Sequence, residues 1–158
     1  MNLMMPSKAG VRTGIVAVGL AAGAVTAAWS GHAVSVSAQG TASVWDGAYL
    51  EEQATRGKDE YEYNCGNCHI HDLSGDSIKD VPPLAGSDFL AKWQGKSVKE
   101  LLDYTTTTMP QDSRGSLGAK TYADITAYIF KVNMFPAGTQ PLEDGPRLAT
   151  TMIEREKK

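Results

Sequence analysis

The residues of this chain that could do chemistry together form one short run, Cys65-Gly66-Asn67-Cys68-His69. Two thiols at this spacing can form thioethers with the two vinyl groups on one edge of a porphyrin, and C-x-x-C-H is the attachment signature of a c-type haem. The adjoining His69 imidazole can then take one axial position on the iron. The sequence therefore predicts one covalently bound haem c, attached through Cys65 and Cys68 and ligated by His69.

Other uses of a cysteine pair need partners that this sequence does not supply. A structural zinc site takes four ligands, but Cys65 and Cys68 are the only cysteines, and the remaining histidines are His32 and His71. A thioredoxin-like redox pair would follow a strand, whereas the residues before Cys65 have a helical pattern. A disulfide or another metal site is the alternative to the haem.

A second axial ligand is predicted at Met109, 40 residues after His69. The soft thioether sulfur of methionine stabilises ferrous iron and leaves no open coordination position. Pro110 follows directly and stiffens the backbone that presents the sulfur. Met134 and Met152 lie at the end of the last expected helix and in the C-terminal segment, and are less well placed. Packing in the apolar core is the alternative for any methionine.

The first 38 residues have the features of an export signal. Lys8 and Arg12 precede an uncharged stretch rich in Ala, Gly and Val, and Val36-Ser37-Ala38 fits cleavage after Ala38. Without a twin arginine, the general secretory route to the periplasm is expected. The alternative is an uncleaved membrane anchor, although an apolar stretch of about 17 residues is short for a span.

Cleavage would leave residues 39–158, a length suited to one small domain. This part contains 13 basic and 18 acidic residues, which is a formal charge of −5. The acidic balance argues against binding to nucleic acid and favours a protein partner with a basic docking face.

Three stretches after the export signal have helical periodicity, and no strand pattern of any length stands out. They span about residues 50–63, 97–107 and 120–133. Ser97 and Glu100 form a capping box at the start of the second stretch, and Thr121 with Asp124 suggests a cap for the third. The pattern predicts an all-α fold.

Three features beyond the haem motif resemble class I, single-haem cytochromes c. Gly57, Tyr61 and Cys65 fall at intervals of four, as in the family's N-terminal helix, where a glycine and an aromatic side chain face the C-terminal helix. Residues 124–129 resemble that C-terminal helix. The run Pro82-Pro83-Leu84-Ala85-Gly86 resembles the family's P-x-L-x-G loop.

The resemblance implies the cytochrome c fold, in which three main helices and their loops wrap one covalently bound haem. It implies that the first and last helices cross nearly at right angles, with Gly57 at the crossing because a residue without a side chain lets two helices approach closely. It also implies that His69 donates a hydrogen bond to the carbonyl of Pro82.

Within the family, the chain resembles cytochromes c associated with quinoprotein alcohol and sugar dehydrogenases. Four segments carry this similarity: Ser43-Val44-Trp45-Asp46-Gly47, Phe89-Leu90-Ala91-Lys92-Trp93, residues 122–133 and Phe135-Pro136-Ala137-Gly138. The similarity places the domain core at about 43–142 and a tail at 143–158. It also implies a hydrogen bond from Trp93 to a haem propionate, with core packing as the alternative. Ile70 and Met134 depart from the pattern, since relatives often have glycine there.

Iron that is ligated by both His69 and Met109 has no position left for a substrate. We therefore expect an electron carrier rather than an enzyme. The expected donor is a quinoprotein alcohol or sugar dehydrogenase, and the expected acceptor a cytochrome or terminal oxidase. Two alternatives stay open: a haem enzyme or gas sensor with an open sixth position, and a fixed relay subunit of a dehydrogenase or oxidase complex.

Overall fold

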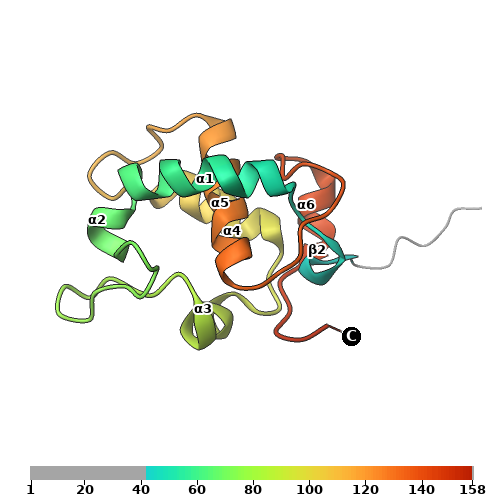
Figure 1. Cartoon of the computed structure of the whole chain (residues 1–158), viewed down its shortest axis with the longest axis horizontal. Coiled ribbons are helices and arrows are strands. Elements are labelled where there is room, and N and C mark those ends of the chain that lie inside the picture. The colour runs from blue at the N-terminus through green and yellow to red at the C-terminus, as the bar shows by residue number, and fades with distance from the viewer. Residues whose placement is uncertain (1–41, 158) are drawn as a thin grey trace, which may run out of the picture. The chain divides into compact units, whose positions relative to one another are not determined.

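The computed structural model describes residues 42–157, and the expected export signal at 1–38 lies outside them. Short helices and turns connect three longer helices (Figure 1). In chain order the elements are β1 (Ala42–Ser43), a 3₁₀ turn (Val44–Asp46), α1 (Glu51–Asn64), α2 (Gly66–His69), α3 (Gly86–Trp93), α4 (Val98–Thr108), α5 (Ala119–Val132), α6 (Pro146–Thr150) and β2 (Thr151–Met152). Within the described residues, no helix is long and apolar enough to cross a membrane.

The three longest helices, α1, α4 and α5, are the three that the periodicity predicts, each within one residue of its expected bounds. The predicted capping box of α4 is present, because Ser97 Oγ accepts from the Glu100 N–H and the Glu100 carboxylate accepts from the Ser97 N–H. The cap predicted for α5 is wrong. This helix begins after Gly118, one turn earlier than Thr121 would place it, and Asp124 has a different partner.

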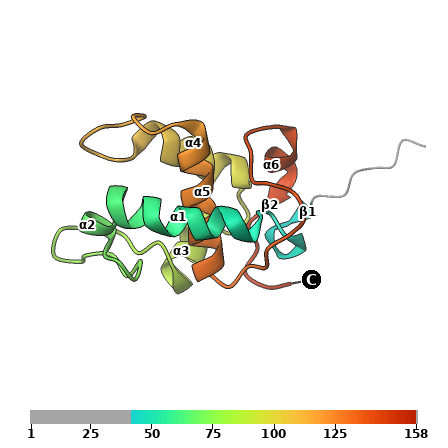
Figure 2. The same ribbon diagram turned by 45° about the horizontal axis from the view of Figure 1, so that its top comes forward.

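The crossing of α1 over α5 is the largest helix contact of the fold (Figure 2). Gly57 lies at this crossing, where a Cβ atom would come within 1.8 Å of the backbone oxygen of Asp124. The Tyr61 ring lies next to the Tyr128 ring of α5, with centroids 5.4 Å apart. The glycine and the aromatic residue therefore face α5, as the resemblance to class I cytochromes c implies.

An ion pair stabilises the crossing of α1 and α5. The Arg56 guanidinium donates to both carboxylate oxygens of Asp124, at 2.8 and 2.9 Å, and the Lys120 ammonium lies 2.5 Å from that carboxylate. The Asp124 side chain is only 2% exposed. Burial alone would raise the pKa of Asp124, but the hydrogen bonds and charges of Arg56 and Lys120 outweigh it, and the pKa lies below its ordinary value.

Stability should therefore depend on the charge of Asp124. Because its pKa is lower in the folded state, the stabilisation is complete above the unfolded pKa of about 3.9 and is lost as pH falls through the folded value. We expect Asp124→Asn to lower the free energy of unfolding by about 2–3 kcal/mol near pH 6, and this difference from the wild type to shrink towards about pH 3. Urea unfolding of the holoprotein, followed by circular dichroism, measures the free energy of unfolding of both proteins near pH 6 and near pH 3.

The matched control is Asp103→Asn, which breaks an exposed ion pair with Lys99 on α4. Such pairs contribute up to about 1 kcal/mol, so this variant should differ little from the wild type at either pH. A deficit of Asp124→Asn that stays constant or grows on acidification would contradict the role given to Asp124.

Helix α3 was not predicted as a helix. It has only eight residues, too few for periodicity to stand out, and a helix of this length depends on tertiary contacts for its stability. Phe89 and Trp93 lie four positions apart and are both buried. Asp88 in the first turn and Lys92 in the last complement the helix dipole.

The core extends further along the chain than the predicted boundary at residue 142. Leu148 and Ile153 are completely buried, and the backbone of Ile153 exchanges hydrogen bonds with Gly95 and Lys96. Strand β2 pairs in parallel with β1, two residues to each strand, although no strand was expected. Two apolar side chains and a short backbone pairing therefore attach most of the expected tail to the domain.

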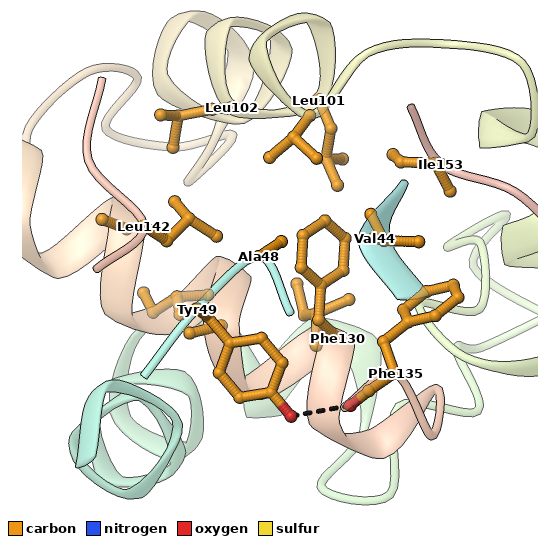
Figure 3. Close-up of a cluster of buried hydrophobic side chains, with 14 of the residues drawn as sticks. Val44, Ala48, Tyr49, Leu101, Leu102, Phe130, Phe135, Leu142 and Ile153 are labelled. Atoms are coloured by element: carbon orange, nitrogen blue, oxygen red, sulfur yellow. Dashed lines mark hydrogen bonds between the residues drawn. The ribbon is translucent and has the colours of Figure 1, made fainter. Parts of the chain in front are cut away.

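Buried side chains from both ends of the chain meet in the core shown in Figure 3. Val44 and Tyr49 come from the first segment, Phe130 from α5 and Phe135 from the turn after it. The Tyr49 hydroxyl donates to the backbone oxygen of Phe135 at 2.8 Å, so that its one polar atom is satisfied. The Phe130 and Phe135 rings pack edge to face, with centroids 5.5 Å apart.

Candidate functional site

The two cysteines lie where α1 passes into α2. Cys65 is the C-terminal cap of α1, with its N–H bonded to the carbonyl of Tyr61, and the N–H groups of Cys68 and His69 both bond to the carbonyl of Cys65. Both thiols are free, Cys65 partly buried and Cys68 exposed. Burial, with a smaller effect of Cys68, raises the pKa of the Cys65 thiol to about 11. This tight turn presents both sulfurs and the imidazole from five consecutive residues.

The His69 ring is fixed through one of its two nitrogens. Its side chain is buried, and Nδ1 lies 2.9 Å from the carbonyl oxygen of Pro82. Because a carbonyl can only accept, Nδ1 carries the proton and Nε2 keeps its lone pair. Burial lowers the pKa of His69 more than the bond to Pro82 raises it, and the charge of Lys92 lowers it further. Nε2 makes no hydrogen bond with any residue in 42–157.

The loop that carries Pro82 is held by Asn133, a residue at the end of the last helix expected from the sequence, to which the sequence analysis gave no role. Asn133, just after α5, donates from Nδ2 to the carbonyl of Leu84 and accepts the N–H of Gly86, both at 2.9 Å. The Tyr61 hydroxyl donates to the carbonyl of Ile70, directly after His69, at 2.7 Å. Asn133 thus positions the loop that carries Pro82, and Tyr61 positions the backbone that follows His69.

Met109 lies at the C-terminal cap of α4, and its side chain is half-buried. Its carbonyl accepts hydrogen bonds from the Tyr122 hydroxyl at 2.7 Å and from the Gly115 N–H at 3.3 Å. Tyr122 is buried in α5, so α5 fixes the backbone that presents the Met109 sulfur. A buried tyrosine hydroxyl requires a partner, which is the signal that could have identified Tyr122 as a positioning residue.

In both views the loop after Met109 lies at the same end as α2 (Figures 1 and 2). Met134 is 79% exposed in the turn after α5, and Met152 lies in β2, which pairs with β1. Of the three methionines in the described part, Met109 is the one at the end that carries the C-x-x-C-H motif.

Trp93 is buried in the core and packs edge to face on Tyr104, with centroids 5.4 Å apart. The ammonium groups of Lys92 and Lys96 lie 5.4 and 5.0 Å from the centre of its ring. Its Nε1 donates no hydrogen bond to any described residue. Trp93 therefore packs in the core, and its hydrogen bond to a haem propionate stays a prediction.

The two departures from the family pattern both have positive φ. Ile70 has a φ of 62° and Met134 a φ of 66°. Residues with a Cβ adopt this region at a cost of about 1–2 kcal/mol, whereas glycine adopts it freely. The backbone thus explains why glycine suits both positions, and the strain at Ile70 lies directly beside His69.

One family model matches the part of the chain that contains this site. Residues 52–129, which include the C-x-x-C-H motif, the Pro82 loop, Met109 and most of α5, match the family model described as cytochrome c oxidase, cbb3-type, subunit III. The chain carries a monohaem cytochrome c domain. Its single C-x-x-C-H motif provides for one covalently bound haem c, and the helical architecture is the all-α cytochrome c fold.

One solved structure is similar to this cytochrome c, the sulfane dehydrogenase SoxCD from Paracoccus pantotrophus. The two are 22% identical, with a TM-score of 0.42, over 58% of this chain and 53% of that chain. The cytochrome thus spans about half the length of that chain. No curated protein matches the sequence.

The donor set of the cytochrome fits haem c better than it fits a bare metal ion. Two free thiols suit the vinyl groups of a porphyrin, and an imidazole with a free Nε2 suits its iron. Within residues 42–157, no group of three or more His, Cys, Asp and Glu side chains is placed to bind a metal ion. Among the described residues, the two thiols therefore lack the further ligands that a zinc site needs.

Proposed function

We propose that this cytochrome is a one-electron carrier in the periplasm, with His69 and Met109 as axial ligands of its haem iron. The observation that carries the proposal is the His69 ring, whose Nδ1 donates to Pro82 while Nε2 is free. When bound, haem c supplies an iron that alternates between ferric and ferrous states. Residues 1–38 would direct export and be removed, leaving 39–158.

The chain's own residues orient both ligands and limit access to them. Pro82 fixes the proton of His69 on Nδ1, and a carbonyl partner on that nitrogen makes the imidazole a stronger ligand. Tyr122 holds the Met109 backbone. A methionine in the sixth position leaves no site for a substrate or gas, which favours a carrier over a haem enzyme.

The donor proposed from the sequence resemblance is a quinoprotein alcohol or sugar dehydrogenase, and the acceptor a cytochrome or terminal oxidase. The matched family model is named for a subunit of an oxidase. That name favours a second candidate, a relay subunit that transfers electrons only inside a larger complex. Size-exclusion chromatography of the native extract separates a free carrier from a fixed subunit.

The proposed function predicts two properties of the purified protein. Acid–acetone extraction should leave the haem on the chain, and the mass should equal residues 39–158 plus one haem, because thioethers resist extraction. The ferric spectrum should be low-spin with a weak methionine–iron charge-transfer band, and voltammetry should show reversible one-electron reduction. Extractable haem, or a high-spin ferric spectrum at neutral pH, would contradict the proposal.

A further inference from the structure

The negative charge of the protein is concentrated beside the haem motif. Residues 58–80 contain six acidic and two basic residues, a formal charge of −4 out of −5 for residues 39–158. Both basic residues are already paired, Lys58 with Glu62 at 2.6 Å and Lys79 with Asp76 at 2.9 Å. The other four carboxylates form no ion pair with a described residue: Asp59, Glu60, Asp72 and Asp80.

Two large apolar side chains lie exposed in the same segment. Tyr63 is 85% and Ile78 96% exposed, on either side of the motif in the chain. Tyr63 is four residues after Asp59 on α1, so the two share one face of the helix. Exposed apolar groups that are rimmed by charge are typical of protein interaction sites.

The segment is held in place relative to the motif. The Gly75 N–H donates to the carbonyl of His69 at 3.0 Å, and Asp76 pairs with Val81 through two backbone hydrogen bonds of 2.9 Å. In both views the end of α1, α2 and this loop lie at one end, opposite β1 and β2 (Figures 1 and 2). Cys68 is exposed at this end, so the porphyrin edge bonded to it lies near the surface.

We propose that Asp59, Tyr63, Asp72, Ile78 and Asp80 form an acidic docking face that also presents two exposed apolar side chains, and that this face receives a redox protein rich in lysine or arginine. The inference rests on the proposed electron-carrier function. Charge complementarity identifies the occupant, because nucleic acid and anionic lipid carry the same sign of charge as this face. Carboxylates steer the partner, and the two apolar side chains hold it at the surface nearest the haem.

The electrostatic part is tested with two variants of equal net charge. Asp59→Asn/Asp80→Asn removes two charges from the face, and Asp80 has positive φ, which asparagine tolerates. Glu143→Gln/Glu156→Gln removes two exposed charges that form no ion pair within the described residues, one before α6 and one near the C-terminus. Hexaammineruthenium(II), which is oxidised to ruthenium(III) as it reduces ferric to ferrous iron, serves as the cationic probe.

The rate at which hexaammineruthenium(II) reduces the ferric haem should fall as the salt concentration rises. This fall should be clearly weaker for Asp59→Asn/Asp80→Asn than for the control Glu143→Gln/Glu156→Gln. The salt concentration that elutes each variant from polylysine resin is a readout independent of electron transfer, and it should drop more for the first pair. Equal effects of the two pairs in either measurement would mean that only net charge acts, and would overturn the docking face.

The apolar part is tested with a lysine-rich cytochrome c as protein probe. Tyr63→Ser/Ile78→Ser should slow electron transfer on the order of five- to tenfold, also at high salt, because apolar contacts are not screened. Met134→Ser, at another exposed apolar position, should change the rate of electron transfer little. Equal rates in the wild type, Tyr63→Ser/Ile78→Ser and Met134→Ser would overturn the role of Tyr63 and Ile78 in docking. A normal spectrum and reversible voltammetry in every variant would show that the carrier function stands even where the docking face fails.

Discussion

Met109→Ala is expected to convert the ferric haem from low spin to high spin or water ligation. The substitution removes the only proposed donor to the sixth position and leaves His69 in place. The ferrous form should then bind carbon monoxide. The reduction potential should fall by on the order of 0.1 V, a fraction of the roughly 0.8 V range that axial ligands span. Absorption spectra and voltammetry measure these changes.

Two matched substitutions serve as controls for the ligand assignment. Met134 is 79% exposed, and Met152 lies in β2, so alanine at either position should keep the low-spin spectrum and the potential. Loss of the methionine–iron band in Met134→Ala or Met152→Ala, with the band intact in Met109→Ala, would show that the assignment is wrong.

Gly57→Ala is expected to destabilise the protein by about 3 kcal/mol or more, at the upper end for overpacking. The added Cβ would lie 1.8 Å from the oxygen and 2.4 Å from the carbonyl carbon of Asp124. Both atoms belong to the backbone of α5, so no side-chain rotation can relieve the contact. The two helices would have to separate, and Cys65 lies at the end of one of them. Urea unfolding of the holoprotein measures the loss.

Helix propensity alone predicts the opposite sign at this position. Alanine in a helix interior is favoured over glycine by about 1 kcal/mol, so Gly57→Ala would stabilise the protein if packing were irrelevant. Gly118→Ala is the matched control, because its Cβ would meet nothing within 4 Å. As an N-cap change it should cost less than about 1 kcal/mol. A Gly57→Ala protein as stable as the wild type would refute the close crossing.

Local sequence patterns were sufficient to predict the three long helices, the haem motif and the all-α class. A helix of 11 or 14 residues repeats its apolar face several times, and C-x-x-C-H is contained in one turn. The proximity of Pro82 to His69 also followed from a motif, since the P-x-L-x-G resemblance implied the bond that the structure contains. The roles of Met109 and Trp93 at the haem stay predictions.

Contacts between distant segments were decided only by the tertiary structure. Helix α3 is too short to be stable alone. Leu148 and Ile153 belong to the tail expected from the sequence, but both are buried in the core, and the backbone of Ile153 bonds to Gly95 and Lys96. The bonds of Tyr122 and Asn133 to the ligand loops join residues far apart in the chain. A single sequence does not encode such pairings locally, because a hydroxyl or an amide finds its partner only when the elements pack.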